Sequence, residues 1–146
     1  MLIGQYEGKI GEKHQAGLPK KFREILGDTV IVTKGFESCL IIVSEENWKT
    51  LLEGTEGKPF TDKSAREMQR FLLGNASSVE LDTKGRFVIP EYLRQFAQLE
   101  SDIIFVGIQR FVEVWGKKQW DEHQKELGKN IESIAQQLQE VEKGKG

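Results

Sequence analysis

The stretch LDTKGRFVIPEYLR, residues 81–94, predicts a complete small folding unit. Residues 79–81 end an alternation of apolar and polar side chains, which is typical of a half-buried strand. Residues 82–85 predict a tight turn, because an Asp side chain accepts hydrogen bonds from the backbone that follows it and a Gly tolerates positive φ. Residues 86–89 alternate again, and the proline after them suits the beginning of a short helix. The polar residues gathered at the tip of this strand, turn, strand and helix are Asp82, Lys84 and Arg86.

An earlier stretch, IGEKHQAGLPKKFR at residues 10–23, repeats this unit at an offset of 71 positions. The offset aligns Ile10 with Leu81, Lys13 with Lys84, Leu18 with Ile89, Pro19 with Pro90 and Arg23 with Arg94. The hairpins that follow also match, and the alignment continues to Trp48 and Trp120. A period near 70 residues is too long for a solenoid repeat and indicates two copies of one small domain. We expect a first repeat at 1–53, a linker and bridging helix at 54–74, a second repeat at 75–120 and a C-terminal helix with a disordered end at 121–146.

These doubled motifs resemble the MraZ family. The tip sequence D-x-K-G-R at residues 82–86, followed by Ile-Pro at 89–90 and Leu-Arg at 93–94, matches the family pattern at every fixed position. The resemblance covers about residues 1–125. The first copy departs from the pattern, since Gly11 holds the acidic position, His14 the glycine position and Gln15 the arginine position.

The resemblance implies a mainly β fold with short helices (α+β), built from two tandem AbrB-like swapped-hairpin repeats related by a pseudo-two-fold axis, plus the C-terminal helix. A single copy is too small to close its own core, so strands of the two repeats should interlock. The resemblance also implies assembly into a closed homo-oligomeric ring.

The composition is that of an ordinary globular chain, with 38% hydrophobic and 30% charged residues. The net charge of −2 provides no general attraction to nucleic acid, so DNA binding would need a local basic patch. Cys39 is the single cysteine, which excludes an internal disulfide, and we expect it to pack as a small hydrophobic residue. No apolar run reaches membrane-spanning length and no signal-peptide core is visible, so we expect a cytoplasmic, nucleoid-associated protein without a membrane partner.

Residues for chemistry are not arranged in any recognisable catalytic pattern. His14 and His123 lack further ligands at metal spacing, and no nucleophile–base pair or phosphate-binding glycine loop is visible. We therefore expect no enzyme activity, metal, cofactor or small-molecule substrate.

The sequence and the resemblance together place double-stranded DNA at the two tips. For Asp82 a structural role in the turn with Gly85 is favoured over a contact, whereas phosphate or base contact is favoured for Lys84 and Arg86. Lys20 and Lys21 are equally consistent with phosphate contact and with a solvated helix surface, as is Arg23. The candidate DNA-binding residues are Lys9, Lys13, His14, Gln15, Lys20, Lys21, Lys84 and Arg86.

Several further expectations concern packing. Phe22, Ile25 and Leu26 should form the apolar face of a helix after Pro19, and Trp48 and Trp120 should both be largely buried at equivalent helix starts. The steps of four and three residues that join Leu127, Ile131, Ile134, Leu138 and Val141 form a short heptad seam. Docking of this seam on its own subunit, or fraying, is as consistent with the sequence as pairing with a partner helix. Residues 143–146 are expected to be disordered.

Two function hypotheses follow. The resemblance implies a sequence-specific transcriptional regulator that binds promoter direct repeats upstream of a division and cell-wall gene cluster. The alternative is an AbrB-fold interaction module, either an oligomeric scaffold or an antitoxin, and the missing arginine at position 15 favours it. An enzyme is a distant third hypothesis.

Overall fold

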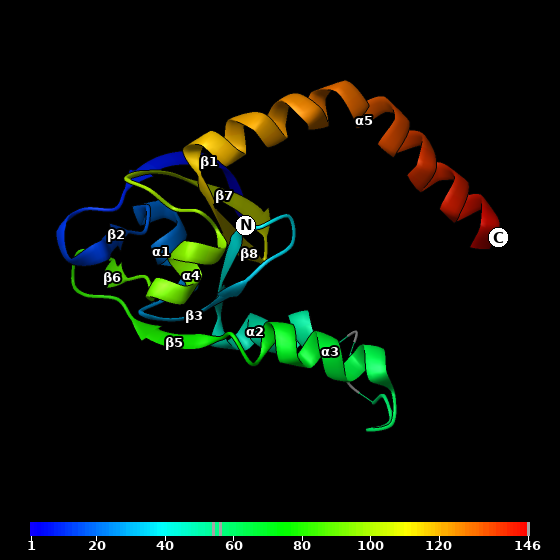
Figure 1. The fold of residues 1–146 in the computed structure, drawn as a ribbon, viewed down its shortest axis with the longest axis horizontal. Helices are drawn as coiled ribbons and strands as arrows, with labels where there is room; N and C mark the ends of the chain where they lie inside the picture. Colours follow the sequence, from blue (N-terminus) through cyan, green and yellow to red (C-terminus); the bar gives the residue numbers. More distant parts are fainter. Residues whose placement is uncertain (54, 56, 146) are drawn as a thin grey trace.

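The computed structural model describes residues 1–53, 55 and 57–145, and a six-stranded antiparallel sheet forms its centre (Figure 1). The strands of this sheet lie in the order β1 (Leu2–Lys9), β7 (Asp102–Gln109), β8 (Phe111–Gly116), β4 (Leu40–Ser44), β3 (Thr29–Lys34) and β5 (Ser77–Glu80). A separate ribbon pairs β2 (Gln15–Gly17) with β6 (Arg86–Val88). The helices are α1 (Lys20–Leu26), α2 (Glu45–Leu52), α3 (Lys63–Leu72), α4 (Glu91–Phe96) and α5 (Lys117–Lys145), and Glu12–His14 form a 3₁₀ turn, η1.

The two repeats exchange strands across a pseudo-two-fold axis. The first strand of each repeat pairs with the hairpin of the other, since β1 pairs with β7 and β5 pairs with β3. Equivalent bonds recur at equivalent positions: Ile10 N–H donates to the Ser101 carbonyl over 2.8 Å, and Leu81 N–H donates to the Asp28 carbonyl over 2.7 Å. The predicted mixed fold of interlocking repeats with a C-terminal helix is confirmed.

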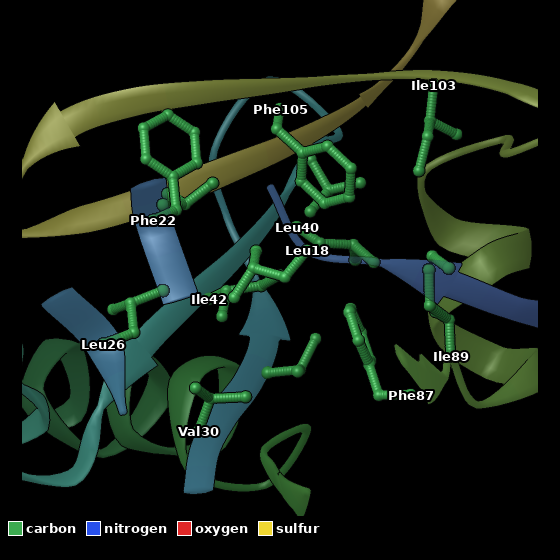
Figure 2. Close-up of a cluster of buried hydrophobic side chains, with 14 of the residues drawn as sticks. Leu18, Phe22, Leu26, Val30, Leu40, Ile42, Phe87, Ile89, Ile103 and Phe105 are labelled. Carbon is green, nitrogen blue, oxygen red and sulfur yellow. The ribbon is translucent and has the colours of Figure 1, made fainter. Parts of the chain in front are cut away.

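The main core lies on one face of the sheet, where side chains of both repeats meet (Figure 2). Phe105 and Ile42 project from the sheet, and Phe22 of α1 and Phe87 of β6 pack in the same cluster. All four are buried almost completely. Burying a side chain of this size contributes roughly 1.5–3 kcal/mol each, so neither repeat completes this core alone.

The opposite face carries a smaller cluster over β7 and β8, which contains Cys39, Ile104, Val106, Trp115 and Trp120. Trp120, the fourth residue of α5, packs 5.2 Å from Trp115 between ring centroids, and its Nε1 donates to Gln5 Oε1 over 3.1 Å. Trp48 is likewise the fourth residue of α2, but it is only half-buried. The prediction that both are largely buried is confirmed for Trp120, whereas Trp48 is buried only in part. No aromatic pair in the described part of the chain includes Trp48, because the strand before α2 carries no counterpart of Trp115.

Three helix ends carry residue types that favour the start or the end of a helix. Ser44 Oγ accepts from the Asn47 N–H at the start of α2, and Asp62 Oδ1 accepts from the Ala65 N–H at the start of α3. Gly27 ends α1 with φ +88°, as expected of a C-terminal glycine. Ile25 is 51% exposed, so its predicted place in the apolar face of α1 is wrong: Phe22 and Leu26, one turn apart, occupy that face.

The predicted linker and bridging helix at 54–74 are only partly described, because Gly54 and Glu56 lie outside the described residues. α5 continues to Lys145, which differs from the predicted disorder at 143–146, and Gly146 again lies outside the described residues. The heptad seam of α5 is exposed, so docking of the seam on its own subunit is wrong. Among the described helices, none is both long and apolar enough to cross a membrane.

Candidate nucleic-acid interface

Asp82 organises the second tip through its side chain. The backbone N–H groups of Lys84 and Arg86 donate to Asp82 Oδ1 over 2.9 and 2.8 Å, and Arg86 Nε donates to Oδ2 over 2.7 Å. Hydrogen bonding by the Arg86 N–H, reinforced by the Arg86 side chain and the Lys84 N–H, holds the pKa of the Asp82 carboxyl below its usual range. Asp82 therefore fixes the turn and holds the Arg86 side chain across it.

The first tip reaches a similar closure without a carboxylate. Gly11 N–H donates to the Gln15 carbonyl over 2.9 Å, just as Asp82 N–H donates to the Arg86 carbonyl over 3.0 Å. The residues between them form η1, in which Lys13 and His14 adopt left-handed φ values of 62° and 60°. His14 stands where the second tip has Gly85, whose φ is +77°. The first tip is therefore a closed turn whose backbone, rather than an Asp, sets its shape.

The ribbon of β2 and β6 joins the two tips. Gln15 lies opposite Val88 and Gly17 opposite Arg86, with Ala16 and Phe87 paired between them on the pseudo-two-fold axis. A hollow of about 520 Å³ opens beside this ribbon. Its polar lining comes from both repeats and consists of Lys9, Glu12, Lys13, Gln15 and Arg86. The structure thus brings four of the eight predicted contact residues, Lys9, Lys13, Gln15 and Arg86, into one place.

The other four predicted residues lie outside this hollow. Lys84 is exposed at the end of the second tip, and His14 is exposed in η1. Lys20 and Lys21 are exposed in the first turn of α1, which begins directly after Pro19. Leu18 N–H donates to the Gly85 carbonyl over 2.9 Å, so the start of α1 is tied to the second tip rather than to the first.

Two of the cations in the hollow already have acidic partners. Lys9 Nζ lies 3.3 Å from Asp102 Oδ1, and both side chains are largely exposed. Arg86 pairs with Asp82, as described above. Exposed pairs of this kind are worth little and exchange readily with other anions. Lys13 is exposed in η1 and has no salt bridge among the described residues, so it is the least compensated cation of the hollow.

Arg23 belongs to the second tip, although it comes from the first repeat. A Cβ on Gly85 would lie 2.6 Å from Arg23 Nη1, so the guanidinium packs directly on the Gly85 backbone. Its counterpart Arg94 uses Nη1 to donate to the Ile89 carbonyl. From the sequence alone, Arg23 is equally consistent with phosphate contact and with a solvated helix surface, and its repetition as Arg94 at the offset of 71 is the signal that it has a defined place.

Cys39 is fully buried, and burial together with the nearby Glu113 carboxylate raises the pKa of its thiol. This confirms the prediction that it packs as a small hydrophobic residue. Within the described ranges, no group of three or more His, Cys, Asp or Glu side chains is arranged to hold a metal ion.

Comparison with known proteins identifies the repeats. The family model described as "MraZ protein, putative antitoxin-like" matches the chain twice, at residues 1–71 and 72–142. A "Transcriptional regulator MraZ" from Caldanaerobacter subterraneus is 42% identical over 138 residues, which cover 94% of this chain and 96% of that protein. Proteins of the same name from a Thermoanaerobacter species and from Caldicellulosiruptor saccharolyticus are 40% and 36% identical, each covering 97% of this chain and 99% of the relative. The chain therefore belongs to the MraZ family of transcriptional regulators.

Proposed function

We propose that the protein is a sequence-specific regulator that binds double-stranded DNA with the two tips and the hollow between them. The observation that carries this proposal is the convergence of Lys9, Lys13, Gln15 and Arg86 from both repeats on one exposed hollow. Cations supply the salt-dependent attraction to phosphates, whereas an amide such as Gln15 can read a base edge. The repeats at 1–53 and 75–120 would each deliver one tip, with 54–74 as the connection between them.

The roles proposed for single residues follow from their surroundings. Lys13 and Lys9 contact phosphates, and Gln15 and His14 lie close enough to Lys13 in the chain to reach bases beside it. Arg86 Nε donates a hydrogen bond to Asp82, so the two terminal nitrogens of Arg86 remain as donors for phosphate or guanine. Lys84, Lys20, Lys21 and Arg23 add phosphate contacts around the second tip.

Assembly completes the proposal. The net charge of −2 leaves a single subunit weakly attracted to DNA. A closed ring of subunits would present the same basic tips at regular spacing, and linked weak contacts reinforce one another through effective concentration. We propose that such a ring binds direct repeats in the promoter of a division and cell-wall gene cluster, in the cytoplasm at the nucleoid.

A second candidate function is an interaction module that neutralises or scaffolds a protein. Two observations favour it: the matched family description includes the word antitoxin, and an uncharged Gln15 replaces the arginine of the first tip.

A mobility-shift titration separates the two functions. The probe is the region upstream of the gene for this protein, and the matched control is a duplex of equal length and composition with shuffled sequence. We expect retention of the upstream duplex at protein concentrations at least tenfold below those needed for the shuffled one. Equal retention of both duplexes would contradict sequence-specific binding, and retention of neither would favour the interaction module.

A further inference from the structure

The C-terminal two-thirds of α5 present an apolar strip that no described part of the subunit covers. Its five side chains are between 36% and 64% exposed: Leu127, Ile131, Ile134, Leu138 and Val141. The positions that flank the strip on either side carry a single charge, and they are Gly128, Asn130, Ala135, Gln137 and Glu142. Two helices that pair through a heptad seam usually carry charges at these flanking positions, which fix partner and register. The strip therefore lacks the features of a symmetric coiled coil and suits an uncharged surface.

An apolar groove of about 520 Å³ lies on another side of the same subunit, between α2 and α3. Its apolar lining consists of Phe36, Ile41, Leu51, Ala65, Met68 and Leu72. Phe36 is 55% exposed although it stacks on Phe71 at 5.9 Å between ring centroids. Lys58 and Asp62 are the charged residues of the lining, and their charges are opposite. The groove therefore has a mostly apolar lining that carries no net charge.

The surface area of the subunit points to burial in an assembly. The chain exposes 9633 Å², whereas a folded monomer of 16.7 kDa exposes about 7,600 Å². Two interfaces of standard size, each burying about 800 Å² per partner, would remove about 1,600 Å², which is most of the excess of about 2,000 Å². A subunit that used its α5 helix in one contact and its groove in another would take part in two such interfaces.

The helix of one subunit does not reach its own groove. α5 is fixed at its start, where Trp120 packs on Trp115 and donates a hydrogen bond to the Gln5 side chain of β1. It then leaves the body beside β1 and β7 and arcs clear of it, so that it stays apart from α2 and α3 on the other side of the molecule (Figure 1). A helix of 29 residues is about 44 Å long and would have to break to turn back.

We propose that the apolar strip of α5 docks into the α2–α3 groove of a second copy of this chain. An amphipathic helix laid in an apolar groove is a common recognition mode, read at spacings of three and four residues. Because the two surfaces differ, the contact is head-to-tail, and a chain of such contacts closes into a ring when the rotation between neighbours allows it. The proposal rests on the self-assembly included in the proposed function, and it names the surfaces that produce it.

Disulfide trapping between two differently tagged chains tests the contact. One chain carries Met68→Cys in the groove and the other carries Leu138→Cys in the strip. The native Cys39 is fully buried and its raised thiol pKa disfavours the reactive thiolate, so it does not compete. We expect mixed disulfide dimers, and at least tenfold fewer when Gln136→Cys, on the opposite side of α5, replaces Leu138→Cys. Predominant disulfides between two chains that both carry Leu138→Cys would overturn the proposal in favour of paired helices. An internal disulfide at high dilution in a chain with both substitutions would overturn it in favour of self-docking.

Mass measurement by light scattering gives an independent test. We expect the wild-type chain to form an oligomer, Leu138→Lys to fall toward the monomer mass of 16.7 kDa, and Gln136→Lys to keep the wild-type mass. Far-ultraviolet circular dichroism should be the same for all three, because both side chains are exposed. A monomeric wild type, or a Leu138→Lys variant of undiminished mass, would overturn the inference. Failure of the oligomeric wild type to bind upstream DNA would instead contradict the proposed function and leave this contact intact.

Discussion

The two tips close the same tight turn with different side chains. Both close with a hydrogen bond across the turn, from Gly11 to Gln15 in the first tip and from Asp82 to Arg86 in the second. The second tip adds three bonds to the Asp82 carboxylate and places Gly85 at the left-handed position. The first tip has no such carboxylate and holds His14 at the left-handed position, where an L-residue is strained. Duplication has therefore kept the turn while its stabilising side chains diverged.

The two tips also differ in how far their cations are paired with acidic side chains. In the second, the arginine that could meet DNA is held by an aspartate. In the first, Lys13 is exposed and unpaired among the described residues. We infer that the second tip contributes more to stability and the first more to the attraction of DNA.

The largest change in stability is expected for substitutions on the pseudo-two-fold axis between the tips. Ala16 and Phe87 occupy equivalent positions and face each other across the ribbon. Phe87→Ala should lower the free energy of unfolding by about 3–5 kcal/mol, because Phe87 is buried. Ala16→Phe alone should lower it by about 1–3 kcal/mol through overpacking. The exchange of both restores the total volume on the axis, so urea denaturation should show a favourable coupling of about 1–3 kcal/mol. Additive losses in the double variant would contradict the symmetric placement of the pair.

The next largest change in stability is expected at the two equivalent positions with left-handed φ, His14 and Gly85. Gly85→Ala should destabilise the protein by about 1–3 kcal/mol, because the new Cβ meets both an unfavourable φ and the Arg23 guanidinium. His14→Gly should act oppositely and raise the free energy of unfolding by up to about 1 kcal/mol. Thermal denaturation of both variants measures this contrast. Adding Arg23→Ala to Gly85→Ala should recover the part of the loss due to the clash, and equal effects of the two single variants would contradict the comparison.

A smaller effect concerns the carboxylate that only the second tip has. The folded-state pKa of Asp82 is depressed, so its ionised form stabilises the fold above the pKa of the unfolded chain, and this stabilisation disappears as the pH falls through the folded-state value. Asp82→Asn should therefore be less stable than the wild type at pH 7, and the difference should shrink below about pH 3.9. Denaturation midpoints across this pH range measure it, with Thr83→Ala as a control in the same turn. A difference that does not change with pH would contradict the role of the carboxylate.

Much of this architecture could be predicted from the repeat. The proline–helix junctions, the hairpins and the tip with Asp82 and Gly85 depend on local signals, and the small size of one repeat implied that the two copies interlock. The lower burial of Trp48 relative to Trp120 could not be predicted from their alignment, because burial depends on neighbours such as Trp115 that the first repeat lacks. Ile25 was misplaced because a helix of seven residues buries only its Phe22–Leu26 edge.

The candidate site was predictable as two tips but not as one surface. The meeting of Lys13 and Gln15 with Arg86 depends on the pairing of β2 with β6, a contact between residues about 70 positions apart. The packing of Arg23 on Gly85 and the direction of α5 likewise depend on tertiary geometry that no local pattern specifies.

The central claim, that the first tip carries the attraction to DNA, is tested by fluorescence anisotropy on upstream DNA at several salt concentrations. We expect Lys13→Ala to weaken binding more than Arg86→Ala. Gln15→Arg should tighten binding and steepen the log–log salt dependence by about 0.9 for each new phosphate contact. Unchanged binding by Lys13→Ala together with loss of binding by Arg86→Ala would contradict the claim and place the DNA-reading surface on the second tip.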